Sequence, residues 1–233
     1  MSGKTLRILV AIIVAACVLV VGAALIIQQS SVAWERQQQA WCLQNLRQIG
    51  FAMIQYAGEY NERHPSALKD EGEPAQRRFA RLLKEYLTAP VVFHCRAASY
   101  GKSPDTRLLD GAELTKCSLE SLADVYLNDD WCSYGTDPRA NHDVPASRAI
   151  LADRPDHRYW GTGVSSPEAG QPGSNSENHG GRAQGVSYND GHVRWAKDCS
   201  DDSEIDPNIY GVNKEIGEAN DSNIRFGTAA EKK

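Results

Sequence analysis

The chain lacks the motifs by which most enzymes and nucleotide-binding proteins are recognised. It has no phosphate-binding loop, no dinucleotide-binding glycine fingerprint and no Gly-x-Ser-x-Gly nucleophile elbow. It also lacks a basic block: without Lys4 and Arg7, 23 of the 25 basic residues remain against 30 acidic ones, a net charge of about −7. A protein that neutralises nucleic-acid phosphates needs the opposite balance. We therefore expect neither nucleic-acid binding nor an enzymatic activity.

Acidic residues are absent from the chain before Glu35, and charge of either sign is absent from Ile8 to Ile27. These 20 mostly apolar residues span roughly 30 Å as a helix, which is the thickness of the bilayer hydrocarbon. Lys4 and Arg7 precede the run, and the positive-inside rule keeps such an N-terminus in the cytoplasm. The sequence thus predicts a single-pass protein of the inner (cytoplasmic) membrane, with residues 1–7 cytoplasmic, 8–27 spanning the membrane and the rest extracytoplasmic.

Two other interpretations of the apolar run stay open. A cleaved signal peptide has a shorter apolar region of about 7 to 15 residues. The segment Val14-Ala15-Ala16-Cys17 loosely resembles a lipoprotein cleavage box, but ten more apolar residues follow Cys17. A buried thiol is the simpler role for this cysteine.

Proline is absent before Pro65, so nothing interrupts a helix that continues beyond the membrane. Apolar residues recur mostly three, four or seven positions apart as far as Tyr56. We predict an extension of the membrane helix over 28–62, ending near Tyr60. Its apolar stripe needs a partner, because it would otherwise face water.

The remaining sequence predicts a domain over 63–198 that mixes short helices and strands. Helices are expected at Ala75–Tyr86 and Ser118–Asp124, and strands at Val91–Phe93 and Ala149–Ala152. Asn189-Asp190-Gly191 lies between two segments of alternating polarity and predicts a hairpin of Gly185–Tyr188 with His192–Ala196. A long loop is expected at 165–182, and a polar tail, loosely packed or disordered, at 199–233. The fold class is therefore α+β, with an antiparallel sheet.

Three segments resemble one known family. They are Cys42 to Gly50 with Tyr56, Tyr60 and Arg63-His64-Pro65; then Val92 to Cys95 with Ser133-Tyr134-Gly135; and finally His179-Gly180-Gly181 with Asn189 to Trp195. In this order they look like the prepilin-like proteins with a DUF1559-type domain of planctomycetes and related bacteria, known for a His-to-Asp-Gly motif. The resemblance covers about two thirds of the chain.

This resemblance implies a fold similar to type II secretion pseudopilins and type IV pilins, in which a long N-terminal helix packs on an antiparallel sheet. It implies His179, Asp190 and Gly191 as the family-motif residues. Two departures stand out. Pilin-like proteins usually begin with a Gly-Phe-Thr-Leu-Ile-Glu type motif, whereas the present chain begins Ser2-Gly3-Lys4-Thr5-Leu6 and has no acidic residue in the apolar run. Ten residues rather than nine separate His179 from Asp190.

Five cysteines follow the apolar run, and in an oxidising compartment pairing is the default expectation. No CxxC or Cys/His spacing indicates a zinc site instead. By the resemblance and by position, the expected disulfides are Cys42 with Cys95 and Cys117 with Cys132, the second stabilising the fold by about 3 kcal/mol through loop closure. Cys199 is then left over.

His179, Asp153 and Asp190 are the residues for which we expect a site, if one exists. Structural roles are the simpler expectation, because Asp190 can cap its own turn, Gly191 can supply a positive φ, and His179 can tie the loop to the sheet. The alternative is a metal at Asp153 and Asp190, for which carboxylate oxygens favour calcium. Two further acidic segments, Asp129-Asp130 and Asp201–Asp206, lack EF-hand spacing and are expected to be solvated surface.

The expected function is that of a membrane-anchored, pseudopilin-like structural or interaction protein of the cell envelope, in its specific form a minor subunit of a type II secretion or pilus-like assembly. The alternative is an anchored extracytoplasmic binding domain that uses a pilin-like scaffold without polymerising. Expected partners are the membrane and other pilin-like or secretion-system subunits, and no cofactor other than the calcium alternative is expected.

Overall fold

The structure of the chain is a computed structural model, and it describes residues 3–61, 63–65, 75–98, 116–127, 132–137, 140–141, 143–154, 176–179 and 183–196. Most of the predicted loop at 165–182, the whole tail at 199–233 and both acidic segments lie outside these residues. The chain divides into two compact units, Met1–Gln38 and Gln39–Lys233.

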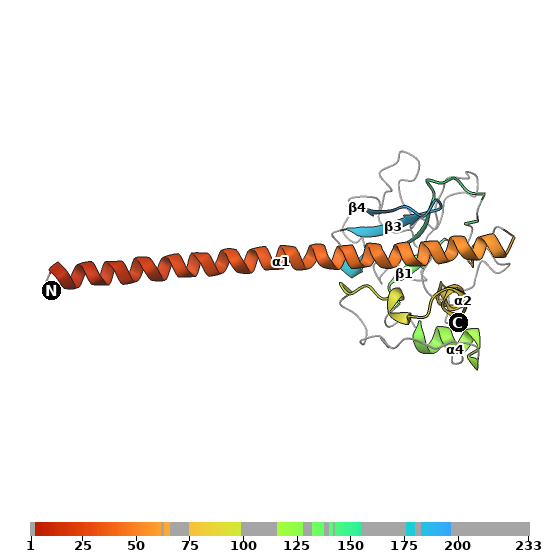
Figure 1. Cartoon of the computed structure of the whole chain (residues 1–233), viewed down its shortest axis with the longest axis horizontal. Coiled ribbons are helices and arrows are strands. Elements are labelled where there is room, and N and C mark those ends of the chain that lie inside the picture. Colours follow the sequence, from red (N-terminus) through yellow and green to blue (C-terminus); the bar gives the residue numbers. More distant parts are fainter. Residues whose placement is uncertain are drawn as a thin grey trace, which may run out of the picture. The chain divides into compact units, whose positions relative to one another are not determined.

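A single helix, α1, runs from Gly3 to Glu59 without a break (Figure 1). This confirms the predicted continuation of the apolar run into a much longer helix. Its first part is long and apolar enough to cross a membrane. Large apolar side chains there are exposed, among them Leu19 and Ile26, as they would be in a candidate membrane span.

Beyond Gln38, α1 carries an inward-facing stripe that forms the spine of the second unit. Cys42, Leu46, Ile49, Met53 and Tyr56 are all buried, and their alternating spacing of four and three residues places them on one face of the helix. Neighbouring helix positions such as Arg47 and Gln48 are exposed. The stripe belongs to one hydrophobic core shared with the other helices and the sheet.

Two short helices and a 3₁₀ turn pack around this spine. Helix α2 (Ala75–Glu85) buries Phe79, Leu82 and Leu83, as predicted, and packs against α4 (Leu119–Tyr126), whose N-cap Ser118 accepts a hydrogen bond from the amide of Ser121. The predicted strand at Val91–Phe93 is wrong: Pro90–Phe93 form the 3₁₀ helix η2. Proline at the first position fixes a helical φ, and three apolar residues are too few to show a period.

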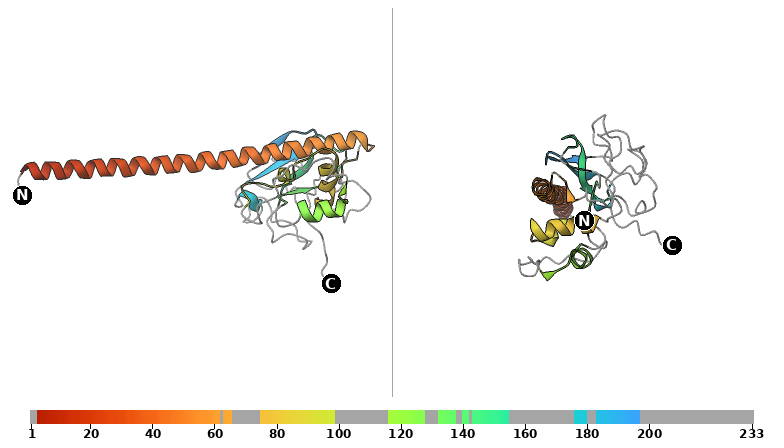
Figure 2. Two further views of the ribbon diagram at one scale, coloured as in Figure 1. Left: turned by 60° about the horizontal axis from the view of Figure 1, so that its bottom comes forward. Right: turned by 90° about the vertical axis from the view of Figure 1, so that its right-hand side faces the viewer.

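The sheet has four antiparallel strands in the order β1-β2-β3-β4. They are β1 (Tyr134–Thr136), β2 (Ala149–Asp153), β3 (Gln184–Tyr188) and β4 (Val193–Ala196). The predicted strand at Ala149 and the predicted hairpin are thereby confirmed, whereas β1 was not predicted. Figures 1 and 2 show β3 and β4 on a different side of α1 from helices α2 and α4.

Close approach between α1 and β3 depends on small residues. A Cβ added at Gly50 would lie 2.7 Å from Ser187 Oγ, and one added at Gly185 would lie 2.4 Å from Leu46 Cδ1. Further along, Gly191 in the hairpin turn lies against Ile54 of the helix. Glycine at positions 50 and 185 therefore lets the helix and the strand pack closely, which positions the cluster described next.

Candidate functional site

A disulfide joins α1 to the segment after η2. Cys42 and Cys95 form this bond with their Cα atoms 5.4 Å apart, and both residues are fully buried. The predicted Cys42–Cys95 pairing is confirmed. After η2 the chain is in extended conformation at His94, and this places Cys95 against α1.

His179 lies directly against this disulfide. It ends the short 3₁₀ helix η4 (Glu177–His179), and its Nε2 atom is 3.4 Å from Cys95 Sγ and 3.5 Å from Asp153 Oδ2. Its ring packs nearly perpendicular to the Trp195 ring on β4, with centroids 4.5 Å apart. Only 7% of the His179 side chain is exposed, and none of the Asp153 side chain.

Asp153 is a buried carboxylate whose two oxygens are held by separate donors. The amide of Gly185 donates to Oδ2 at 2.6 Å, and Asn178 Nδ2 donates to Oδ1 at 2.9 Å. The same Asn178 amide group also donates to the carbonyl of Ser133, tying β1 to the cluster. A buried polar group is tolerated when it is hydrogen-bonded in this way, and these hydrogen bonds hold the Asp153 side chain at the end of β2.

These contacts bring together four potential ligands from four separate segments. One ligand atom each from Cys42, Cys95, Asp153 and His179 lies within 4.8 Å of the others. The set combines sulfur, nitrogen and oxygen, which suits zinc and differs from the all-oxygen set that calcium prefers. While the two sulfurs are bonded to each other, they are not thiolates and leave only His179 and Asp153 as ligands.

Asp190 and Gly191 lie in the turn between β3 and β4. Asp190 Oδ1 accepts hydrogen bonds from the amide of His192 at 3.0 Å and contacts the Nδ1 atom of its ring. Gly191 has a φ of +84°, which favours glycine. Partial burial raises the pKa of Asp190, but the hydrogen bonds and charge of His192 outweigh it, so the pKa lies below its ordinary value.

The strand register separates His179 from Asp190 and Gly191. Ala149 at the start of β2 pairs with Tyr188 beside the turn, whereas Asp153 at the other end of β2 meets Gly185. His179 therefore shares a site with Asp153, and Asp190 lies at the opposite end of the strands. The predicted metal ligands Asp153 and Asp190 do not come together.

Cys117 and Cys132 both carry thiols, so the predicted second disulfide is not formed. Cys132 is fully buried, and its thiol donates to the carbonyl of Tyr134 at a distance of 3.9 Å. Cys117 is only partly buried and precedes α4. The second disulfide was predicted from the resemblance and from the loop between the two cysteines. Loop length says nothing about side-chain direction, which decides whether two cysteines can pair.

A second buried histidine, His64, joins the end of α1 to the hairpin turn. Its Nδ1 lies 3.2 Å from the carbonyl oxygen of Met53, and its Nε2 lies 2.8 Å from Asn189 Oδ1. Asn189 Nδ2 in turn donates to the carbonyl of Val144. This network joins the end of α1 to the turn between β3 and β4.

Sequence reasoning missed Asn178 and the grouping of the two cysteines with His179 and Asp153. No local spacing could have indicated this group, because its members come from α1, the segment after η2, the end of β2 and η4. The one signal in the sequence that could have indicated this group was a predicted buried strand that ends in an aspartate.

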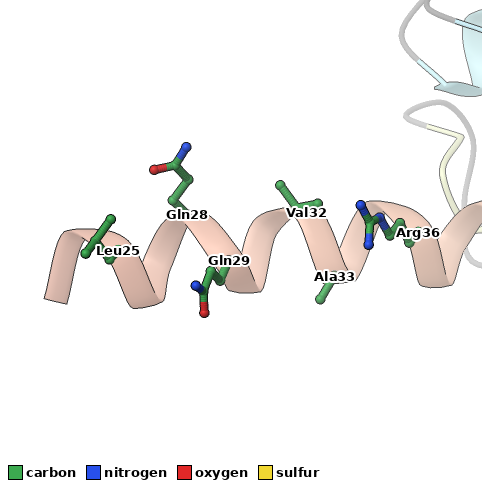
Figure 3. A pocket seen from close by; sticks show the side chains of 6 residues that line it. All are labelled: Leu25, Gln28, Gln29, Val32, Ala33 and Arg36. Carbon is green, nitrogen blue, oxygen red and sulfur yellow. The ribbon is translucent and has the colours of Figure 1, made fainter. Parts of the chain in front are cut away.

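The first unit offers a shallow depression rather than an enclosed site. It is lined by side chains that lie three or four positions apart along α1: Leu25, Gln28, Gln29, Val32, Ala33 and Arg36. Figure 3 shows all six projecting from the same helix. A single helix cannot enclose a small ligand, so we assign no binding site there.

The chain was compared with protein-family models, with curated proteins and with solved structures, and it matches none of them.

Proposed function

We propose that the protein is a membrane-anchored scaffold of the cell envelope, built like a pseudopilin and acting through interactions rather than catalysis. The observation that supports this most is the continuity of α1: the helix that is long and apolar enough to cross a membrane is also the spine of a domain with an antiparallel sheet.

Orientation follows from charge. Lys4 and Arg7 precede the apolar segment, and no acidic residue occurs before Glu35, so the N-terminus stays in the cytoplasm and the domain lies outside. The Cys42–Cys95 disulfide supports this side of the membrane, because disulfides persist in oxidising compartments.

Assembly into a pilus-like fibre is the specific form of this proposal, with a minor pseudopilin as the expected role. The alternative is a binding domain that stays monomeric in the membrane. It is favoured by one observation: the apolar segment has no acidic residue, and a membrane-embedded charge is normally functional. Both forms share the anchor and the orientation.

Protease accessibility tests the orientation. In spheroplasts with an intact membrane, added protease should digest the domain and leave a protected fragment that contains the apolar part of α1. In inverted membrane vesicles the domain should resist digestion. Digestion in the inverted vesicles alone would contradict the proposed orientation.

Two measurements separate the two forms. The intact mass of the membrane-extracted chain detects removal of a few N-terminal residues, as in pilin processing, or a lipid on Cys17. Crosslinking in the membrane through the exposed thiol of Cys17 should give a covalent dimer if α1 helices associate, and Cys17→Ser provides the matched control. An unprocessed chain that gives no dimer would favour the monomeric binding domain.

A further inference from the structure

The cluster around the Cys42–Cys95 disulfide has a geometry that a disulfide alone does not require. The Nε2 atom of His179 contacts both Cys95 Sγ at 3.4 Å and Asp153 Oδ2 at 3.5 Å. A proton relay would use the two ring nitrogens for its two partners. Here both contacts fall on one nitrogen, and the sulfur, nitrogen and oxygen atoms all lie within 4.8 Å of one another.

Two of the distances among the four ligand atoms match those of a tetrahedral zinc site. Zinc bonds of 2.3 Å to sulfur and 2.0–2.2 Å to nitrogen and oxygen place S and N about 3.6 Å apart, and N and O about 3.4 Å apart, at the tetrahedral angle. The corresponding distances in the structure are 3.4 Å and 3.5 Å. His179 and Asp153 therefore already have the separations that zinc ligands need, and the missing change is cleavage of the bond between the two sulfurs.

The surrounding residues hold the carboxylate as the outer shell of a metal site does. Gly185 N donates to Asp153 Oδ2 and Asn178 Nδ2 donates to Oδ1, while the Trp195 ring packs edge-to-face with the His179 ring. Such partners fix ligand orientation and are a regular part of zinc sites.

Charge also permits metal binding at this site. Zn²⁺ with two thiolates, one carboxylate and one imidazole carries a net charge of −1, so these ligands offset the charge of the metal in a position that is mostly buried.

We propose that reduction of the Cys42–Cys95 disulfide opens a buried zinc site whose ligands are Cys42, Cys95, His179 and Asp153. A dithiol reductant transfers two electrons and two protons to the disulfide and is itself oxidised to a disulfide. Zn²⁺ then binds both sulfurs and displaces the two thiol protons to solvent. The junction between α1 and the segment after η2 is thus held by a covalent bond in the oxidised state and by the metal in the reduced state.

The full-length chain in detergent provides the test. It is reduced with a phosphine under nitrogen, loaded with Zn²⁺ or Co²⁺, and freed of loose metal by gel filtration. We expect about one zinc per reduced chain, essentially none per oxidised chain, and a tetrahedral cobalt spectrum with sulfur-to-cobalt charge transfer. Absence of stoichiometric zinc in the reduced chain would overturn the proposed site.

Variants distinguish this site from adventitious binding by thiols. His179→Ala, whose folding is checked by circular dichroism, should bind zinc at least 10-fold more weakly in competition with a chelator. Cys42→Ser/Cys95→Ser should lose the charge-transfer band, and Cys117→Ser, which removes a thiol outside the cluster, should keep both zinc and spectrum. Equal zinc affinity in His179→Ala and the wild type would refute the assignment, as would loss of zinc in Cys117→Ser.

Discussion

Gly50→Ala is a sharp test of how α1 packs on the sheet, because the same helix contains a matched control. Alanine in place of glycine inside a helix normally stabilises it by about 0.5–1 kcal/mol. A Cβ at Gly58 meets nothing within 4 Å, so Gly58→Ala should show this gain. A Cβ at Gly50 would lie 2.7 Å from Ser187 Oγ, which is shorter than a relaxed contact between carbon and oxygen.

The size of the penalty follows from where Ser187 lies. The residue is fully buried on β3, so its hydroxyl cannot turn away freely, and overpacking of such a site costs about 1–3 kcal/mol. Gly50→Ala should therefore be about 1–3 kcal/mol less stable than Gly58→Ala. In a unit of this size each kcal/mol corresponds to roughly 2–4 °C in Tm.

Removing the hydroxyl should rescue the variant. Ser187 Cβ lies 3.8 Å from the added Cβ, an ordinary contact, so only Oγ obstructs it. That oxygen has no hydrogen-bond partner among the described residues, and Ser187→Ala by itself should be neutral or stabilising. In the double variant the penalty should vanish, giving a coupling of about 1–3 kcal/mol in a double-mutant cycle.

Urea unfolding of the full-length chain in a mild detergent, followed by tryptophan fluorescence, gives these differences directly. The reasoning fails if Gly50→Ala is as stable as Gly58→Ala. It also fails if the Gly50→Ala penalty is unchanged by Ser187→Ala, since the obstruction would then lie elsewhere.

Three further predictions concern other contacts of the domain. Gly185→Ala, which brings a Cβ within 2.4 Å of Leu46 Cδ1, should lower stability by about 1–3 kcal/mol in the same urea assay; an unchanged midpoint would contradict this. Partial burial and the hydrogen bond to Glu59 raise the pKa of Tyr86. The contribution of Tyr86 to the free energy of unfolding is complete at pH values below its unfolded pKa of 10.0. It is lost as the pH rises through the raised pKa of the folded state, so the wild type should lose stability at alkaline pH more steeply than Tyr86→Phe. The pKa of Asp190 is lowered in the folded state, so this residue stabilises the fold at pH values above its unfolded pKa, and the stabilisation is lost as the pH falls through the folded pKa. In His192→Ala an NMR titration should show a higher pKa for Asp190. An unchanged Asp190 pKa would be the contrary result.

Local periodicity was enough to predict the helical framework. The apolar spacing from Cys42 to Tyr56 and the absence of proline before Pro65 predicted one long helix, and α1 runs to Glu59. The hairpin was predictable because Gly191 follows two turn-forming residues. In each case the determining interactions lie within a few positions of each other along the chain.

Features set by distant contacts were not predictable. Strand β1 has three residues, all buried, so it lacks the alternation of polarity that marks a half-exposed strand. The Val91–Phe93 segment resembles a strand in composition, but Pro90 begins a 3₁₀ helix there. The grouping of His179 with Asp153 depends on the registers of β2 with β3 and on the course of η4, which no local pattern encodes.

The candidate site shows the same division. Sequence reasoning named His179, Asp153, Cys42 and Cys95 separately, as a motif residue, a possible metal ligand and a disulfide pair. Only the fold shows that these are neighbours, and it assigns Asp190 to a different place. Composition and spacing identify residue types with chemical potential, whereas tertiary packing decides which of them share a site.

If the protein is anchored through the N-terminal part of α1, as we propose, the Cys42–Cys95 bond has a mechanical consequence. The two cysteines are 53 positions apart in sequence, and the bond closes the chain between them into a ring. Tension applied to the membrane helix passes from Cys42 directly to Cys95, so the end of α1 and all of α2 carry none of it. About 53 residues, or roughly 170–190 Å of fully stretched chain, are thereby withheld from extension. Pulling on the N-terminal end of α1 would load the chain that follows Cys95, which contains α4 and the four strands, and would leave the end of α1 and all of α2 at rest.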